Sequence, residues 1–306
     1  MLSFTLKRLI SALLTLLVVS VLTFSLSHMA GDPAAAIAGK EASGEDVSRI
    51  RTFYGLDRPV TVQYFDWLGK AVRGDFGMSY HYRQPVSAMI GTRLPVTLTL
   101  GISALIFALA LGIPLGVVAA LKPGSMLDRF AMGVAVVGQA MPSFWFALLM
   151  IVVFGLTLRL LPISGNGSWK HYVMPTVVLG YFATPALMRL TRSGMIDALQ
   201  SDYIRTARAK GMLAGKILFR HALRNVVVSI VAISSVQLGA MLGGSIVVEQ
   251  IFALQGIGWL GYDATVRSDL PVLQAITLVV AGFYVLLTLV ADLVSVALDP
   301  RLRLGR

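Results

Sequence analysis

The sequence contains no cysteine and little charge. Without cysteine the chain has no disulfide framework, no thiolate metal site and no cysteine nucleophile. Charged residues make up 13% of the 306 residues, whereas a soluble globular protein has roughly 25%. Hydrophobic residues make up 56% of the chain, and the mean hydropathy is +0.78. This composition excludes an ordinary soluble domain and predicts a membrane protein.

Patterns typical of catalytic and metal sites are also missing. No G-x-S-x-G nucleophile elbow occurs, and no carboxylate pair at helical spacing stands where it would support acid–base hydrolysis, so an intramembrane hydrolase is poorly supported. The histidines stand singly, without the spacing of a metal site, at His28, His81, His171 and His221. The segment "GMLAGKI", 211–217, lacks the spacing and the Ser or Thr of a phosphate-binding loop. We therefore expect no enzyme activity, metal site or cofactor in this chain.

The segment "GIGWLG", 256–261, matches the G-x-G-x-x-G pattern of dinucleotide-binding folds. It follows an apolar stretch, however, and not a strand that leads into a helix. We expect a tight re-entrant turn instead, with its glycines at positive φ and Trp259 at the membrane interface.

Six apolar stretches are long enough to cross about 30 Å of hydrocarbon. They are about 9–29, 98–121, 130–161, 172–190, 226–252 and 272–298. The third is too long for one span and contains Pro142, so we expect a kink there. The first follows Lys7 and Arg8 and exceeds the apolar core of a signal peptide, so we interpret it as a retained helix. The sequence predicts an all-α integral membrane protein with about six transmembrane helices.

The distribution of lysine and arginine predicts the orientation. With the N-terminus in the cytoplasm, that side holds Lys7, Arg8, Lys122, Arg129, the cluster from 189 to 224, Arg301, Arg303 and Arg306. The opposite side holds residues 32–93, in which seven acidic and eight basic residues nearly cancel. Both termini are then cytoplasmic, and the net charge of +11 reflects topology. We expect a first helix within 1–30, a periplasmic cap at 31–95, a permease core at 96–300 with a cytoplasmic loop at 191–225, and a tail at 301–306.

A charged residue within an apolar span is a candidate for a translocation pathway, because a charge in hydrocarbon must face a cavity, a bundle or a partner. The kink segment "QAMPSF", 139–144, is a candidate because broken helices often line transporter sites, the alternative being a proline kink that serves only packing. For Glu249 a pathway role and a structural pairing both remain open. Asp292 is interpreted as structural, within reach of Arg301 or a loop cation. The small residues of 238–247 favour close helix packing over pathway lining. The candidate pathway residues are Gln139, Met141, Pro142, Ser143, Gln237 and Glu249.

A compact basic segment, "SDYIRTARAKG" at 201–211, interrupts the apolar chain between the fourth and fifth spans. Ser201 or Asp202 can cap a helix there, and Gly211 suits its C-terminal end. A helix of about two turns is not stable alone in water. At helical spacing it places small and apolar groups beside cations, with Tyr203 near Ala207 and Ile204 near Arg208. We expect it to dock into a socket on another protein, the alternative being contact with anionic lipid.

The residues "DYIRTARAKG", followed by "RHALRN", resemble the cytoplasmic EAA loop of binding-protein-dependent ABC importers, in the form found in the peptide/nickel permease family. Further segments are similar to the B-type permease subunit of that family, so the resemblance covers nearly the whole chain. They are "GDP" at 31–33, "YGLDRPVTVQYFDWL", "GDFGMS", "RQPV", "RLPVTLTL" and "DPRLR" at 299–303. Arg205 stands where the general loop pattern has glutamate, so no salt bridge of that glutamate is carried over.

The resemblance implies a type I ABC importer permease in the bacterial inner membrane. The expected partners are a homologous second permease, two cytosolic ATPase subunits that bind ATP and magnesium, a periplasmic substrate-binding protein and the lipid bilayer, without nucleic acid. The implied coupling helix comprises Tyr203, Ile204, Arg205, Thr206, Ala207, Arg208, Ala209, Lys210 and Gly211. The expected substrates are dipeptides, oligopeptides or glutathione-like tripeptides, moved by alternating access. The alternative within the family is a nickel or metal-chelate importer.

A hypothesis of a different class is a membrane scaffold or insertion factor whose basic loop binds RNA or lipid. Such binding would weaken steeply with salt. It would not depend on Ala207 or Gly211, whereas docking into a protein socket would.

Overall fold

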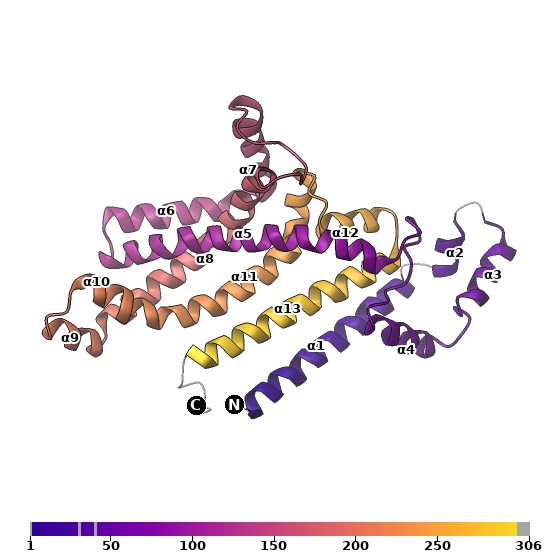
Figure 1. The fold of residues 1–306 in the computed structure, drawn as a ribbon, viewed down its shortest axis with the longest axis horizontal. Coiled ribbons are helices and arrows are strands. Elements are labelled where there is room, and N and C mark those ends of the chain that lie inside the picture. The colour runs from indigo at the N-terminus through magenta and orange to yellow at the C-terminus, as the bar shows by residue number, and fades with distance from the viewer. Residues whose placement is uncertain (1, 30–31, 40–41, 299–306) are drawn as a thin grey trace. The chain divides into compact units, whose positions relative to one another are not determined.

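The computed structural model describes residues 2–29, 32–39 and 42–298, and these are almost entirely helical (Figure 1). They form two compact units. The first, here called the bundle unit, comprises residues 98–254 and 287–298. The second, the cap unit, comprises the described residues of 2–97 together with 255–286. The expected C-terminal tail, with Arg301, Arg303, Arg306 and the "DPRLR" segment, lies outside the described residues, as does Gly31 of "GDP".

Five helical stretches among the described residues are long and apolar enough to cross a membrane. They are Thr5–Met29 within α1 (Leu2–Met29), α5 (Val86–Leu121), α8 (Lys170–Gln200), the continuous stretch Ala214–Ile251, and Leu270–Val294 within α13 (Leu270–Leu298). The fourth stretch joins α10 (Ala214–Lys216), a π-helix η2 (Ile217–Ala222) and α11 (Leu223–Ile251). With one bent pair counted as a span, six result, as the hydropathy predicts.

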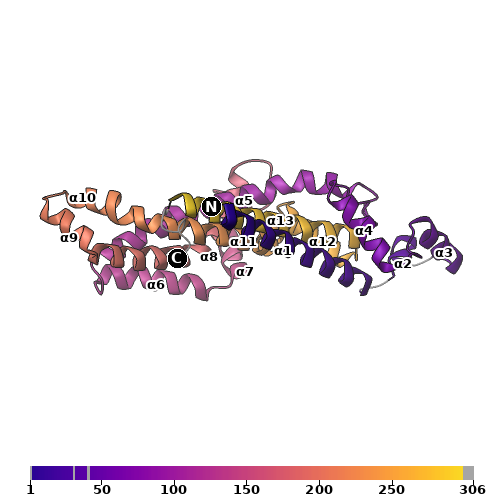
Figure 2. The same ribbon diagram turned by 90° about the horizontal axis from the view of Figure 1, so that it is seen from below.

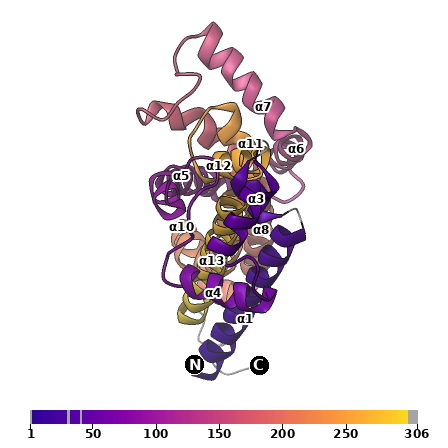
Figure 3. The same cartoon turned by 90° about the vertical axis from the view of Figure 1, so that its right-hand side faces the viewer.

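The bent pair confirms the predicted break at Pro142. It joins α6 (Met126–Ala140) to α7 (Ser143–Met150), which continues as a π-helix η1 (Ile151–Thr157). The two halves meet at 100°, and Figure 3 shows α7 leaving the direction of α6. Met141 is extended, at φ −79° and ψ 126°, because a residue before proline avoids the helical region and proline has no N–H to continue the helix.

In the bundle unit, α8 contacts α5, α6 and α11 (Figures 1 and 2). Two glycines allow the close crossing of α5 and α8. A Cβ on Gly116 would lie 2.6 Å from the Met188 carbonyl oxygen, and a Cβ on Gly180 would lie 2.5 Å from the Ala104 carbonyl oxygen. Small residues are the usual means of close helix approach in membranes, where lipid is as apolar as the side chains.

In the cap unit, three short helices lie between α1 and α5: α2 (Pro33–Ala38), α3 (Gly44–Phe53) and α4 (Val60–Ala71). The helix α4 packs on α1. The Ser20 and Tyr64 hydroxyl oxygens are 2.8 Å apart, and His28 Nε2 lies 3.1 Å from Gln63 Oε1. The ring of Phe24 contacts Tyr64 edge-on, with 5.4 Å between ring centroids.

The helix α5 begins at Val86, twelve residues before the predicted apolar span. Its first turns bury Val86 and Ile90 against Leu260 and Val272, which come from α12 (Ile257–Val266) and α13. These partners are far away in the sequence, so hydropathy alone did not place the start of α5.

The expectation that the glycines of "GIGWLG" form a tight turn at positive φ is wrong. Gly256 has φ −91° and precedes α12, whose residues include the other two glycines of the motif. The positive φ lies earlier, at Ala253, with φ 49°. The helix begins after Gly256 because the Ile257 N–H donates to the Thr97 hydroxyl at 2.8 Å, which satisfies a backbone donor that a helix start leaves open.

Candidate functional site

The basic segment forms the short helix α9 (Asp202–Ala209), directly after the long helix α8. Gly211 has φ 73°, and its N–H donates to the Arg208 carbonyl at 2.9 Å. The predicted helix and its glycine terminus are therefore confirmed. Ser201 occupies the N-cap position, but its hydroxyl donates back to the Ala198 carbonyl and does not cap α9.

The inner face of α9 is buried against its own chain. Ile204 is fully buried and Ala207 is 6% exposed, where α9 contacts α8 and η2. After the end of α9, the Met212 N–H donates a hydrogen bond to the Ala207 carbonyl at 3.2 Å. The expectation that Ile204 and Ala207 are presented to another protein is therefore wrong, because both fix the helix to this chain.

The outer face of α9 is cationic. Arg205, Thr206, Arg208, Ala209, Lys210 and Gly211 are exposed. Arg205 pairs with Asp202 at 3.2 Å, and both side chains are exposed, so the pair contributes little to stability. The Tyr203 hydroxyl accepts from Asn225 Nδ2 at 2.6 Å.

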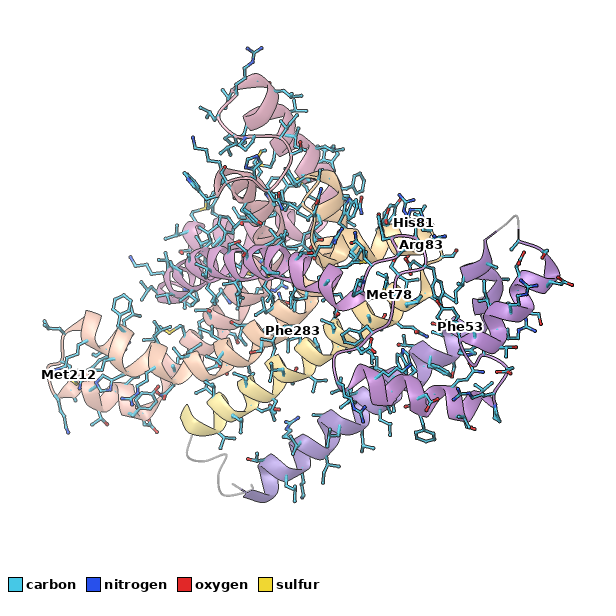
Figure 4. All side chains as sticks on the ribbon, turned by 45° about the vertical axis from the view of Figure 1, so that its right-hand side comes forward. Phe53, Met78, His81, Arg83, Met212 and Phe283 are labelled. Atoms are coloured by element: carbon cyan, nitrogen blue, oxygen red, sulfur yellow. The ribbon has the colours of Figure 1, made fainter. Side chains whose placement is uncertain are left out.

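Two apolar side chains beside α9 are exposed, and neither was among the site residues predicted from the sequence. Leu213 is 78% exposed and Phe219 is 65% exposed. Met212, between α9 and α10, marks this end of the bundle unit in Figure 4. Their signal in the sequence is the presence of large apolar residues within a cationic loop. Exposing such residues to water is unfavourable, and they do not help to bind anions.

Part of the predicted pathway set lies together at a small apolar cavity. The cavity of about 270 Å³ lies between α7, α8 and α11. Its lining includes Ser143, Phe182, Gln237, Ala240, Met241 and Gly244. A Cβ on Gly243 or Gly244 would meet no atom within 4 Å. Within this chain these two glycines therefore do not serve the close helix packing that the sequence analysis expected of them.

The remaining pathway candidates do not line this cavity. Met141 and Pro142 form the break between α6 and α7. The side chain of Gln139 accepts a hydrogen bond from Arg189 Nη1 at 2.9 Å. The structure thus brings Ser143 and Gln237 together and leaves these three beside the break.

Glu249 is enclosed by its own unit. It is fully buried near the end of α11, and its Oε1 accepts a hydrogen bond from the Ser245 hydroxyl at 2.9 Å. A nearby loop covers this end, because the Gly165 N–H donates to the Phe252 carbonyl at 2.9 Å. Its burial favours the structural alternative for Glu249. Asp292 is partly buried on α13, and its expected partner Arg301 lies outside the described residues.

In the cap unit, Asp269 fixes the segment before α5, a role that was not among the predictions from the sequence. Asp269 is 1% exposed. It accepts hydrogen bonds from the Ser79 hydroxyl, from the Tyr80 N–H at 3.2 Å and from the His81 N–H at 3.3 Å. Figure 4 shows this segment by its labelled residues Met78, His81 and Arg83. The partners are about 190 residues apart, so no local pattern reveals them.

A second carboxylate, Asp263, extends this network. It accepts from the Tyr82 hydroxyl at 2.8 Å and from Arg267 Nε at 2.9 Å. Burial, together with the charge of Asp269, raises the pKa of Tyr80 to about 12. Burial and the hydrogen bond to Asp263 likewise raise the pKa of Tyr82. Both tyrosines are therefore neutral at physiological pH.

A larger cavity of about 940 Å³ lies within the cap unit. Its wall comes from α1, α2, α3, α4, the segment before α5 and the start of α13, and includes Phe24, His28, Trp67, Lys70, Tyr80 and Gln274. No group of three or more His, Asp or Glu side chains that could hold a metal ion is found in the part of the chain that the structure describes.

Comparison with known proteins identifies the family. The model of the binding-protein-dependent transport system inner membrane component matches residues 112–304, and the model of its N-terminal region matches residues 1–101. The chain belongs to this family. It is therefore an inner-membrane permease component of a binding-protein-dependent importer, as the EAA-like loop indicates.

Named relatives cover the permease from end to end. The glutathione transport system permease protein GsiC of Escherichia coli strain K12 is 40% identical over 304 residues, 99% of each chain. The GsiC protein of Salmonella typhimurium strain LT2 is also 40% identical over 99% of each chain. In an inward-facing structure of the MetNI methionine ABC transporter, one chain matches with a TM-score of 0.55 and 19% identity, over 69% of this permease and 96% of that chain. The fold is thus that of a type I ABC importer permease.

Proposed function

We propose that this permease imports short peptides, with glutathione as the first substrate to test. The observation that carries the proposal is the 40% identity to a glutathione transport permease over 99% of both chains. Substrate passes between this permease and a homologous partner by alternating access. The apolar cavity beside Ser143, Gln237 and Gly244 supplies this chain's part of the wall, and the partner supplies the rest.

The exposed face of α9 docks on a cytosolic ATPase subunit, which binds ATP and magnesium. Arg205, Arg208 and Lys210 contribute charge to this face, and Leu213 and Phe219 contribute apolar area beside it. A surface that combines cations with exposed large apolar groups suits a protein socket better than water. Ile204 and Ala207 hold α9 on its own chain, so that force on the helix reaches α8.

The cap faces the periplasm and receives the substrate-binding protein. The support is the charge distribution, because lysine and arginine concentrate in the loops around α9 and near the N-terminus, while the charges of 32–93 nearly cancel. Under this orientation both termini and the loop 191–225 are cytoplasmic, and residues 31–95 form the periplasmic cap.

The test is uptake by the reconstituted importer. The permease, its partner permease and the ATPase are placed in liposomes with the binding protein, and uptake of labelled glutathione is measured with and without ATP. We expect ATP-dependent uptake that dipeptides reduce by competition and nickel ions do not. ATP-dependent uptake of nickel without peptide uptake would contradict the substrate assignment.

A further inference from the structure

An ion pair with a buried carboxylate and a partly buried guanidinium joins the start of α6 to α8 in the bundle unit. Arg192 Nε lies 2.6 Å from Asp128 Oδ1, and Arg192 Nη2 lies 2.7 Å from Asp128 Oδ2. The Asp128 side chain is 5% exposed and that of Arg192 is 26% exposed. The Gly124 N–H donates a further hydrogen bond to Asp128 Oδ2 at 2.8 Å. A two-point contact between planar groups fixes the rotation as well as the distance of the two helices.

Stability alone does not explain this pair. Two charges lose hydration on burial, so a buried ion pair often stabilises a fold no better than apolar residues of the same size. A geometric role is better attested, because such a pair permits one register between its helices and penalises others.

Through Arg192, the ion pair is connected to α9 by the last turns of α8. The helix α8 continues without a break from Arg192 to Gln200, about 12 Å at 1.5 Å per residue, and α9 follows after Ser201. This end of α8 is held on further sides. A Cβ on Gly116 of α5 would lie 3.1 Å from the Arg192 nitrogen, and a Cβ on Gly194 would lie 2.9 Å from Val226 of α11. The connection between the ion pair and α9 is therefore short, and this end of α8 is closely packed against α5 and α11.

Through Asp128, the ion pair is connected to the apolar cavity by α6 and the start of α7. From Asp128 the helix α6 runs to Ala140 and ends at the 100° break. The first residue of α7, Ser143, lines the apolar cavity. A second polar contact joins α8 to the end of α6, since Arg189 Nη1 donates to Gln139 Oε1 at 2.9 Å. Both ends of α6 are thus attached to α8 by arginines one helical turn apart.

We propose that Arg192 and Asp128 transmit the movement of α9 to the bent pair of α6 and α7, and so position the cavity wall around Ser143 during transport. The inference rests on the proposed docking of α9 on an ATPase. Arg192 and Asp128 are positioning residues, because they act through α6 and do not line the cavity. Their function is to convert motion at the cytoplasmic end into a change at the break.

The experiment compares coupling among four variants of the reconstituted importer. Asp128→Asn and Arg192→Lys each remove one half of the two-point contact while keeping the size of the side chain close to the original. The double variant Asp128→Arg with Arg192→Asp restores an ion pair with reversed charges. Arg129→Gln is the control, since Arg129 is exposed on the same helix and makes no ion pair with any described residue. The readouts are ATPase co-purification, ATP hydrolysis and glutathione uptake per ATP hydrolysed.

We expect both single variants to retain the ATPase and to hydrolyse ATP, while uptake per ATP falls by about tenfold, within the usual range of coupling between sites. The charge-reversed double variant should recover much of the lost coupling, and Arg129→Gln should match the wild type. Unchanged uptake per ATP in both single variants, beside a coupled wild type, would overturn the inference alone. Single variants that lose thermal stability and ATPase together, without recovery in the double variant, would also overturn it, since the pair would then be structural. Absence of the ATPase from wild-type preparations would instead overturn the proposed function on which the inference rests.

Discussion

At the residue scale, Tyr80 makes the stability of the folded permease depend on pH. Its pKa is raised to about 12 by burial and by Asp269, whereas an unfolded tyrosine titrates near 10. The neutral form is therefore favoured by folding. The contribution of Tyr80 to the free energy of unfolding is complete below pH 10. It is lost as the pH rises from 10 towards 12, because this tyrosine ionises in the unfolded chain before it ionises in the folded protein.

We expect the thermal unfolding temperature of the detergent-solubilised permease to fall between pH 10 and 12, and to fall less in Tyr80→Phe. Unfolding curves at closely spaced pH values provide the measurement. Tyr262→Phe, which removes a hydroxyl from an exposed position on α12, is the matched control. Identical pH profiles for wild type and Tyr80→Phe would show that Tyr80 is not the group responsible.

Gly116 gives a second prediction at this scale. A Cβ there would lie 2.6 Å from the Met188 carbonyl and 2.7 Å from Thr191 Cβ, so Gly116→Ala forces α5 and α8 apart. Overpacking of this kind costs about 1–3 kcal/mol, which should lower the unfolding temperature. Gly133→Ala on α6 serves as the control, since a Cβ at Gly133 would meet no atom within 4 Å. Equal unfolding temperatures for the two variants would argue against the close crossing.

At the element scale, the two faces of α9 separate folding from docking. Ala207 is buried and Ala209, two residues on, is exposed. Ala207→Asp places a charge in an apolar contact and should destabilise the loop. Ala209→Asp should leave the permease folded and reduce ATPase co-purification by about tenfold or more, equivalent to ~1.4 kcal/mol.

Protease digestion of the loop and pull-down of the ATPase measure the two effects separately. Salt provides a further check, because binding to RNA or anionic lipid weakens steeply as salt rises. If Ala209→Asp retained full ATPase binding, the exposed face of α9 would not be the docking surface.

The elements also show what the sequence could and could not predict. Hydropathy located the spans because a membrane helix needs a long apolar stretch, and Pro142 marked the break because proline interrupts helical hydrogen bonding. The start of α5 at Val86 depends on packing against Leu260 and Val272, which no local window contains. The burial of Ala207 depends similarly on contacts of α9 with α8 and η2.

In the candidate site, too, local features were predictable from the sequence and long-range contacts were not. The glycine end of α9 follows from a local capping rule, whereas the predicted Ser201 cap does not form. Ser143 was selected as part of the proline kink, and Gln237 as a polar residue within an apolar span. The pair of Asp128 and Arg192 joins residues 64 positions apart, and the Asp269 network joins residues about 190 apart. Long-range polar contacts of this kind have no signature in a single sequence. The prediction that Ile204 and Ala207 contact a partner was wrong. Helical periodicity shows which residues share a face of α9, but it does not show whether the same chain or another protein covers that face.

At the scale of the whole molecule, the family and the distribution of charge together bear on how the permease lies in the membrane. The family match and the type I fold establish an inner-membrane permease, while the charge distribution supports a cytoplasmic α9 and a periplasmic cap. Since the chain has no cysteine, a single introduced cysteine is a unique chemical label. Lys210, exposed just after α9, and Ser48, within α3 of the cap, are suitable positions for opposite sides of the membrane.

The most direct test of the central claim, that α9 is the cytoplasmic docking helix of an importer, is cross-linking from Lys210→Cys in cells that express the ATPase. The account predicts a cross-link to the ATPase, and protection of this cysteine from a membrane-impermeant thiol reagent that does label Ser48→Cys. Labelling of Lys210→Cys from outside the inner membrane, or the absence of any ATPase cross-link in an assembled and active complex, would contradict it.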